Sequence, residues 1–259
     1  MAFRTGPKRA AGFSAMAPLQ SNGEGELPQS TRPRFAGVVF DLDGVLAVSE
    51  HLWEEHWTIF ADAHGYTWTP DDTATVQGMS VPEWAAYLGA RAGQRPVPEV
   101  AEAVVGGMIT ALHAGRVDLL PGAPAMVATA AARVPIGVAS SAARRVIDAV
   151  LEATDLRQYF SAVVSSEEVP RGKPAPDVYL AAAREIGIPA TECIGVEDSS
   201  NGIRAAAAAG MTVIAIPNPH YPPKPDALAL CAQIAASPDD VRETFAAWLP
   251  ASAASGDRR

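Results

Sequence analysis

The chain has 259 residues, of which 48% are hydrophobic, and its 20 Lys and Arg against 29 Asp and Glu give a net charge of −9 at pH 7. This length fits one large domain or two small ones, and the apolar fraction excludes a mostly disordered chain. The acidic balance argues against a nucleic-acid partner, because nucleic-acid affinity depends on clustered Lys and Arg. The longest uncharged stretch, residues 205–223, is interrupted by four prolines, so the sequence offers no membrane-spanning helix.

Residues 1–34 are rich in Gly, Pro, Ser and Arg, and we expect them to form a disordered leader, with Met16 as an alternative start. Residues 250–259 are expected to form a disordered tail for the same reason. The two cysteines, Cys193 and Cys231, make neither a CxxC pair nor a disulfide framework, which indicates a reducing compartment. Together with the lack of a convincing secretory segment, this predicts a cytoplasmic protein.

Between these ends, short apolar or β-branched runs predict buried strands over 35–42, 135–140, 161–165, 192–198 and 211–217, the third being the weakest. Helical stretches over 142–151, 176–187 and 201–209 follow three of these runs. This alternation is typical of a parallel sheet built from βαβ units, so we predict an α/β core.

Residues 49–119 break this rhythm. They show helical spacing, as in Trp53, Trp57 and Phe60, which we interpret as core residues rather than a platform for stacking sugars. The segment holds ten acidic residues, three arginines, no lysine and four of the five tryptophans. We therefore predict a helical cap domain over 49–119, inserted into a core domain made of residues 35–48 and 120–249.

Two acidic clusters lie where predicted strands end: Asp41 and Asp43 at the end of the first, and Glu197 and Asp198 at the end of the fourth. The carboxyl ends of parallel strands lie at one edge of a sheet, where open α/β sheets bind ligands. The clusters would repel each other there unless a cation lay between them, and oxygen ligands suit Mg²⁺. Each cluster alone has an ordinary alternative, a pair of Asp residues before a turn or a helix cap at Asp198.

Two further residues suit a phosphoryl group. Lys173 is one of only three lysines among 20 basic residues, and a compact ammonium fits a tight site better than a wide guanidinium. Ser140 ends a predicted strand and leads into a helix, where a hydroxyl and free N–H groups make an anion site. Taken alone, Lys173 could equally be a solvated residue in a turn and Ser140 a helix cap.

The motifs together are much more specific than any one of them. They are, in chain order, Asp41-Leu42-Asp43-Gly44, Ser140, Lys173 within Gly-Lys-Pro-Ala-Pro-Asp, and Glu197-Asp198 followed by Ser-x-x-Gly. In this order the chain resembles the haloacid dehalogenase (HAD) superfamily and, within it, the small phosphatases and β-phosphoglucomutase-like proteins. The resemblance covers about residues 35–248 and implies a Rossmann-like parallel sheet with a helical cap inserted after the first motif.

The resemblance also implies catalytic roles. Asp41 would attack phosphorus and form an aspartyl-phosphate, and Asp43 would act as general acid and then as general base. Asp43 points to phosphate esters, since dehalogenases of the superfamily lack this second Asp. Ser140 and Lys173 would hold the phosphoryl oxygens.

A Mg²⁺ cofactor is implied in the same way. The Asp41 carboxylate, the backbone carbonyl of Asp43 and Asp198 would bind the ion, and Glu197 would contact it directly or through another ligand.

The predicted cap departs from the mutases of this subfamily. They place a His on the first cap helix and an Arg directly after a Gly-x-Ser stretch, whereas this chain has Trp53 and Val81 at the matching positions. An acidic cap has little means of binding a second phosphate. The run from Ser49 to Trp53 instead resembles the start of the cap in sugar-phosphate phosphatases, although Val48 replaces the usual Asp.

We therefore predict a Mg²⁺-dependent phosphatase that acts on a small phosphorylated metabolite, a sugar phosphate. The alternatives are a β-phosphoglucomutase-like isomerase and a regulatory or binding protein without turnover. Nucleic acid and membrane are not expected as partners, and a monomer is favoured.

Overall fold

The computed structural model describes residues 35–251. The leader predicted over 1–34 and most of the tail predicted over 250–259 lie outside the described residues.

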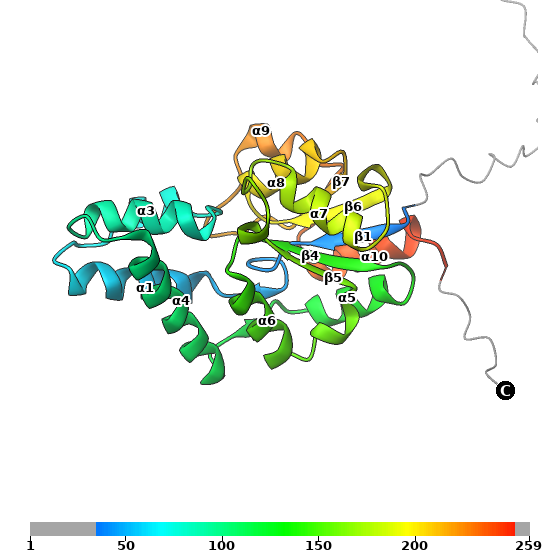
Figure 1. Ribbon diagram of the computed structural model, residues 1–259. Helices are drawn as coiled ribbons and strands as arrows, with labels where there is room; N and C mark the ends of the chain where they lie inside the picture. The colour runs from blue at the N-terminus through cyan, green and yellow to red at the C-terminus, as the bar shows by residue number, and fades with distance from the viewer. Residues whose placement is uncertain (1–34, 252–259) are drawn as a thin grey trace, which may run out of the picture. The chain divides into compact units, whose positions relative to one another are not determined.

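A six-stranded parallel sheet, in the order β5-β4-β1-β6-β7-β8, forms the centre of the fold (Figure 1). Its strands are β1 (Gly37–Phe40), β4 (Ile136–Ser140), β5 (Ala162–Ser165), β6 (Cys193–Glu197), β7 (Thr212–Ala215) and β8 (Gln233–Ile234). The prediction of an α/β fold with a parallel sheet is confirmed. β8 was not predicted, because two residues are too short to show the alternation typical of a strand.

Helices cover both faces of this sheet (Figure 1). Val38 and Phe40 belong to an apolar cluster that includes residues of α5 (Ala123–Ala131), α6 (Arg144–Ala153) and α10 (Pro238–Trp248), and Val39 belongs to a second cluster that includes residues of α7 (Asp177–Glu185) and α8 (Ser200–Ala208). This alternation follows from the period of two along a strand. The first face carries α5, α6 and α10, and the second carries α7 and α8.

The helices predicted over 142–151, 176–187 and 201–209 are α6, α7 and α8, with their ends shifted by one or two residues. Three helices were not predicted, namely α5, α10 and the short α9 (Pro225–Leu228). Short 3₁₀ helices lie at Arg157–Tyr159, Ser166–Glu168 and Ala190–Glu192.

The register of the central strands brings three chain segments to one edge of the sheet. Phe40 of β1 lies beside Val138 of β4 and Val196 of β6. Because all three strands run in the same direction, the residues that follow meet at their carboxyl ends. These residues are Asp41, Ser140 and Glu197.

Four helices lie between β1 and the rest of the sheet in the sequence. They are α1 (Glu50–Ala63), α2 (Pro70–Val76), α3 (Val81–Arg91) and α4 (Val97–His113). They are preceded by β2 (Ala47–Val48) and followed by β3 (Asp118–Leu119), which pair antiparallel. The chain therefore leaves the core and returns to it through adjacent segments. That residues 49–119 form a separate cap domain stays a prediction.

Tryptophans fill the interior of this helical segment. Trp57 has its ring centroid 5.9 Å from that of Trp53, 5.8 Å from that of Trp68 and 6.0 Å from that of Trp84. Trp53, Trp57 and Phe60 are all buried, as expected of core residues. The burial of these aromatic side chains therefore stabilises the packing of the helices in this segment against one another.

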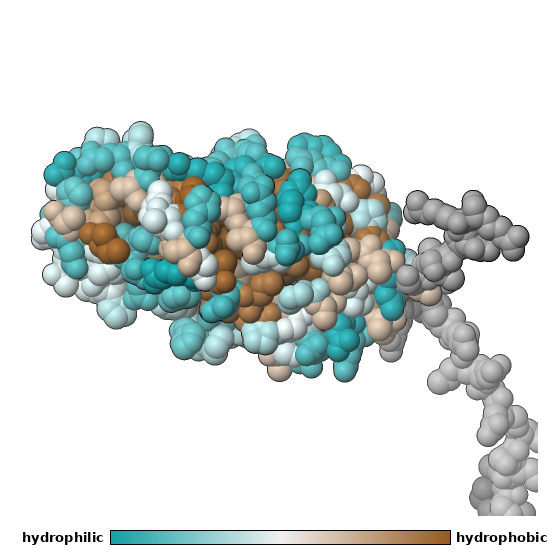
Figure 2. Space-filling model, turned by 90° about the horizontal axis from the view of Figure 1, so that it is seen from below, coloured by the Kyte–Doolittle hydropathy of each residue, from teal (hydrophilic) through white to brown (hydrophobic). Residues whose placement is uncertain are grey.

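The surface seen in Figure 2 is mainly hydrophilic, with hydrophobic residues in smaller groups. The exposed large hydrophobic side chains come from separate parts of the chain: Ile59, Tyr159, Leu180, Leu230 and Ile234. Within residues 35–251, no helix combines the length and apolar character needed to cross a bilayer.

Asp72 is a buried acid that joins three parts of the helical segment. Its carboxylate accepts hydrogen bonds from the hydroxyls of Tyr66 at 2.9 Å, Thr69 at 2.7 Å and Tyr87 at 2.7 Å. The Nε of Arg91 lies 3.4 Å away. Burial alone would raise the pKa of Asp72, but the hydrogen bonds from Tyr87, Thr69 and Tyr66 lower it to about 2. The ionised carboxylate therefore stabilises the packing of α2 against α3.

We expect Asp72→Asn to lower the free energy of unfolding by about 2 kcal/mol at neutral pH. The pKa is lower in the folded state than the ordinary 3.8, so the contribution is present above that value and is lost as the pH falls towards about 2. Urea unfolding at about pH 7 and about pH 3 should show a smaller difference between wild type and variant at the lower pH. The exposed neighbour Asp71→Asn is the control, with an expected change below about 0.5 kcal/mol. An Asp72→Asn loss that does not depend on pH would contradict this account.

Candidate active site

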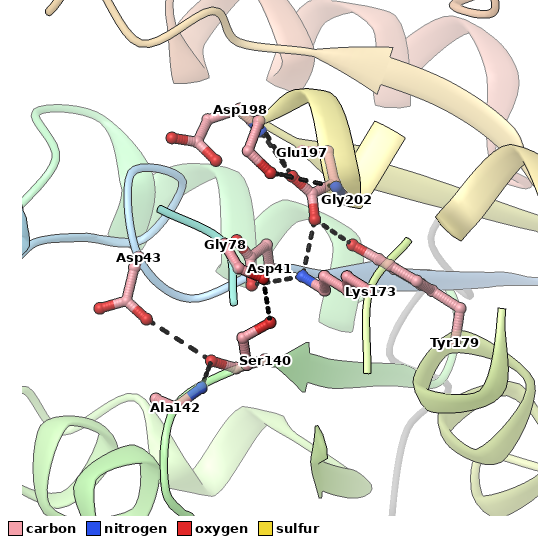
Figure 3. Close-up of polar contacts among 12 residues, drawn as sticks. Asp41, Asp43, Gly78, Ser140, Ala142, Lys173, Tyr179, Glu197, Asp198 and Gly202 are labelled. Atoms are coloured by element: carbon pink, nitrogen blue, oxygen red, sulfur yellow. Dashed lines mark hydrogen bonds and ion pairs between the residues drawn. The ribbon is translucent and has the colours of Figure 1, made fainter. Parts of the chain in front are cut away.

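Lys173 lies between the carboxyl ends of strands β1 and β6. Its ammonium group is 2.9 Å from Oδ1 of Asp41 and 2.7 Å from Oε1 of Glu197 (Figure 3). All three side chains are buried. Burial alone would lower the pKa of Lys173, but the carboxylates of Asp41 and Glu197 raise it above its usual range. A permanent buried cation therefore joins the ends of β1 and β6.

Both carboxylate oxygens of Glu197 accept hydrogen bonds. Besides Lys173, Oε1 accepts from the hydroxyl of Tyr179 at 2.8 Å. Oε2 accepts from the backbone N–H groups of Asp198 at 3.0 Å and Ser199 at 3.1 Å, and from the Ser199 hydroxyl at 3.1 Å. The carboxylate thus lies at the N-terminus of α8 and accepts from the two residues that precede this helix, where unpaired N–H groups favour negative charge.

Gly202 makes room for this carboxylate. A Cβ atom at Gly202 would lie 1.6 Å from Oε1 of Glu197, so any side chain there would displace the acid. Gly44, the residue after Asp43, makes room for a carboxylate in the same way. Its φ is +76°, and a Cβ atom would lie 2.1 Å from Oδ2 of Asp198.

Three carboxylates at this edge fit a divalent cation. Asp41, Glu197 and Asp198 each offer an oxygen, and these atoms all lie within 4.8 Å of one another. Burial raises the pKa of Asp41 although Lys173 opposes it, and burial and the neighbouring acids raise the pKa of Asp198. The cluster therefore holds more negative charge than one lysine offsets. Oxygen donors in this arrangement suit Mg²⁺.

Asp43 is half-buried and is held from two sides. Its Oδ1 accepts hydrogen bonds from the hydroxyl of Ser49 and from the indole N–H of Trp53, the latter at 3.1 Å. Its Oδ2 lies 3.5 Å from Oγ of Ser140 (Figure 3). The Ser140 hydroxyl in turn accepts from the backbone N–H of Ala142 at 3.0 Å.

Asn218 and Glu50 complete the acidic side of the site, and neither residue was predicted to belong to it. The side-chain amide of Asn218 donates to Oε1 of Glu50 at 2.5 Å and lies 3.4 Å from Oδ2 of Asp198. Burial and the nearby Asp43 carboxylate raise the pKa of Glu50. The loop after β7 is thereby joined to the first turn of α1.

A cavity opens between this edge of the sheet and the helical segment. Its lining includes Asp41, Asp43, Asp198 and Lys173 from the core, Glu50, Trp53, Trp57, Val76 and Trp84 from the helices, and Met79 from the loop between α2 and α3. Of the cavity-lining residues in the part of the chain described here, Lys173 is the only Lys or Arg. The cavity therefore has an acidic floor with one cation and an aromatic wall.

All six predicted site residues meet at this edge of the sheet. Asp41, Asp43, Lys173 and Asp198 line the cavity, whereas the side chains of Ser140 and Glu197 are fully buried behind it. Their chemical roles stay predictions. Neither Tyr179 nor the contact of Trp53 with Asp43 was predicted from the sequence. The only signal for Tyr179 was a phenol within a helix whose other buried positions are apolar.

Comparisons with known proteins agree on one family. The family model described as "haloacid dehalogenase-like hydrolase" matches residues 35–210. Hexitol phosphatase B of Escherichia coli is 33% identical over 196 residues, which cover 73% of this chain and 87% of that protein. Fructose-1-phosphate phosphatase YqaB of Escherichia coli is 29% identical over 70% of this chain and 96% of its own length.

Solved structures share the fold. The crystal structure of CbbY from Rhodobacter sphaeroides in complex with phosphate superposes with a TM-score of 0.70 at 25% identity, covering 79% of this chain and 95% of that one. The β-phosphoglucomutase of Clostridium difficile superposes with a TM-score of 0.68 at 21% identity, over 82% of this chain and 99% of that one.

Replacing each of two helical glycines by Ala tests whether Gly202 is needed to make room for Glu197. Replacement of a helical Gly by Ala ordinarily stabilises a helix by up to about 1 kcal/mol. We expect Gly106→Ala in α4, where the added Cβ meets nothing within 4 Å, to follow this rule. Gly202→Ala in α8 should instead destabilise the protein by about 1–3 kcal/mol, because Glu197 must move. Thermal unfolding measures both, and equal gains in stability would refute the proposed fit.

Proposed function

The chain belongs to the haloacid dehalogenase-like hydrolases, and we propose that it is a Mg²⁺-dependent phosphatase for a small sugar or polyol monophosphate. The observation that carries this proposal is the placement of Asp41 and Asp43 on one cavity together with Lys173, the only Lys or Arg among its described lining residues. Two carboxylates in one site can divide the work of nucleophile and proton carrier, and the buried ammonium offsets charge on the phosphoryl oxygens.

In the first step, a carboxylate oxygen of Asp41 attacks phosphorus, and the bond from phosphorus to the ester oxygen breaks. Asp43 gives its proton to that oxygen, so the leaving group departs as a neutral alcohol. Lys173, held by Glu197, donates a hydrogen bond to Asp41, which favours its ionised form and orients it for attack.

In the second step, water attacks the phosphorus of the aspartyl-phosphate. Asp43, now ionised, takes the proton of that water, and the bond between Asp41 and phosphorus breaks to release inorganic phosphate. Both carboxyl groups return to their starting states, so the cycle balances.

Mg²⁺ would be held by the carboxylates of Asp41 and Asp198 and by the backbone carbonyl of Asp43. When bound, it would offset the negative charge of the phosphoryl oxygens. Glu197 is close enough to contribute an oxygen, but its hydrogen bonds to Lys173, Tyr179 and backbone N–H groups favour a role in holding Lys173.

The cavity supports a monophosphate as substrate. A second phosphate would need a second group of positive charges, whereas the helical segment lines the cavity with Trp53, Trp57 and Trp84 and with no Lys or Arg among its described residues. Aromatic faces pack well against the carbon skeleton of a sugar or polyol. The similar proteins named for hexitol and fructose 1-phosphate support the same class. The mutase alternative would need cationic residues for a second phosphate, and the described lining residues include no Lys or Arg besides Lys173.

The test is phosphate release from a panel of hexitol and sugar monophosphates with Mg²⁺. We expect turnover by the wild type and a fall to less than about one thousandth in Asp41→Asn, because the nucleophile is lost. Asp62→Asn, an exposed acid on α1, is the matched control and should keep full activity. Circular dichroism and thermal unfolding check that both variants fold.

Two results would overturn the proposal. Conversion of β-glucose 1-phosphate to glucose 6-phosphate without release of phosphate would identify a mutase. Undiminished turnover by a folded Asp41→Asn variant would exclude the aspartyl-phosphate mechanism.

A further inference from the structure

Trp53 contacts the proposed acid–base residue although it belongs to the helical segment. We propose that Trp53 is a positioning residue that fixes the carboxyl group of Asp43, so that the proton exchanged with the leaving group is carried on Oδ2. The inference rests on the proposed phosphatase function and gives Trp53 a role that the sequence analysis did not assign to it.

The two oxygens of Asp43 have different surroundings. Oδ1 accepts both the indole N–H of Trp53 at 3.1 Å and the hydroxyl of Ser49. Oδ2 has a looser contact, 3.5 Å from Oγ of Ser140. A rotation that exchanged the two oxygens would break the hydrogen bonds on Oδ1, so the carboxyl group is held in one orientation.

The indole is itself held firmly. Trp53 is 7% exposed. Its ring stacks on that of Trp57 with centroids 5.9 Å apart and lies 6.0 Å from that of Trp84. Trp53 also lies on α1 only a few residues beyond Ser49, so both donors to Oδ1 come from the start of the same helix. Packing therefore fixes the direction of the N–H group.

The choice of Trp has a chemical consequence. An indole N–H donates a hydrogen bond but cannot accept one or take up a proton at neutral pH. Trp53 therefore cannot replace Asp43 as proton carrier, as a His at this position could. An oxygen that already accepts two donors is also a poor place for the acid proton, which leaves Oδ2.

This arrangement acts on the first step of the reaction. The proton on Oδ2 moves to the ester oxygen as the bond from phosphorus to that oxygen breaks and the bond from Asp41 to phosphorus forms. Without Trp53 the carboxyl group is free to turn, and the acid proton spends less time facing the leaving group. The loss should be largest for leaving groups that depend most on protonation.

Substituted phenyl phosphates test this directly, because they share one shape and differ in the acidity of the phenol. The value kcat/KM reports steps up to release of the phenol and excludes hydrolysis of the aspartyl-phosphate. For Trp53→Phe we expect a loss of about tenfold or more with unsubstituted phenyl phosphate and less than about threefold with 4-nitrophenyl phosphate. A plot of log kcat/KM against the pKa of the phenol should therefore be steeper than for the wild type.

Trp57→Phe is the matched control. Trp57 belongs to the same aromatic stack, but its buried indole N–H has no hydrogen-bond partner among residues 35–251 and does not donate to Asp43. Whatever its effect on absolute values, its plot should run parallel to that of the wild type. A Trp53→Phe plot that is also parallel would overturn the inference and leave Trp53 as a packing residue only.

A second variant covers the case in which Trp53→Phe does not fold. Ser49→Ala removes the other donor to Oδ1 and should steepen the plot in the same direction; a parallel plot would count against the inference. Failure of the proposed function is separable, because the wild type would then release no phosphate from any aryl, sugar or hexitol phosphate.

Discussion

The ammonium group of Lys173, buried between the carboxylates of Asp41 and Glu197, is the interaction on which the site depends. A buried ion pair contributes little to stability by itself, because the desolvation of its charges offsets their attraction. Removing one partner is strongly destabilising, however, since it leaves a buried charge unpaired. The chain therefore surrounds Glu197 with donors from Tyr179 and from the backbone between β6 and α8. These contacts fix Lys173, and Lys173 fixes the proposed nucleophile.

The helical segment supplies the other half of the cavity and has its own buried acid. Asp72 is satisfied entirely by hydroxyl groups, a backbone N–H group and one arginine, and so it organises packing without an excess of charge. The acids at the edge of the sheet differ, because their charge exceeds that of their single lysine. This contrast separates a structural carboxylate from carboxylates that fit a metal. Trp53 joins the two halves through its hydrogen bond to Asp43.

Much of the fold and of the residue set at the sheet edge could be predicted, for a physical reason. Asp41, Ser140 and Glu197 each lie at the end of an apolar run, and parallel strands bring such ends together. The contacts of Tyr179 and Trp53 could not be predicted in this way. Helical spacing indicates that a side chain is buried, but the partner depends on how separate elements pack. The two-residue strands β2, β3 and β8 were missed because no alternation can develop over that length.

The excess of negative charge around Lys173 is the central claim, and thermal unfolding with and without Mg²⁺ tests it most directly. The wild type should gain about 2–3 kcal/mol of stability at a Mg²⁺ concentration near one hundred times Kd. Asp198→Asn should lose this gain and, without Mg²⁺, should be about as stable as the wild type, because burial and the neighbouring acids already disfavour the charged form of Asp198. A wild type indifferent to Mg²⁺, or an Asp198→Asn variant that responds equally to Mg²⁺, would contradict the account.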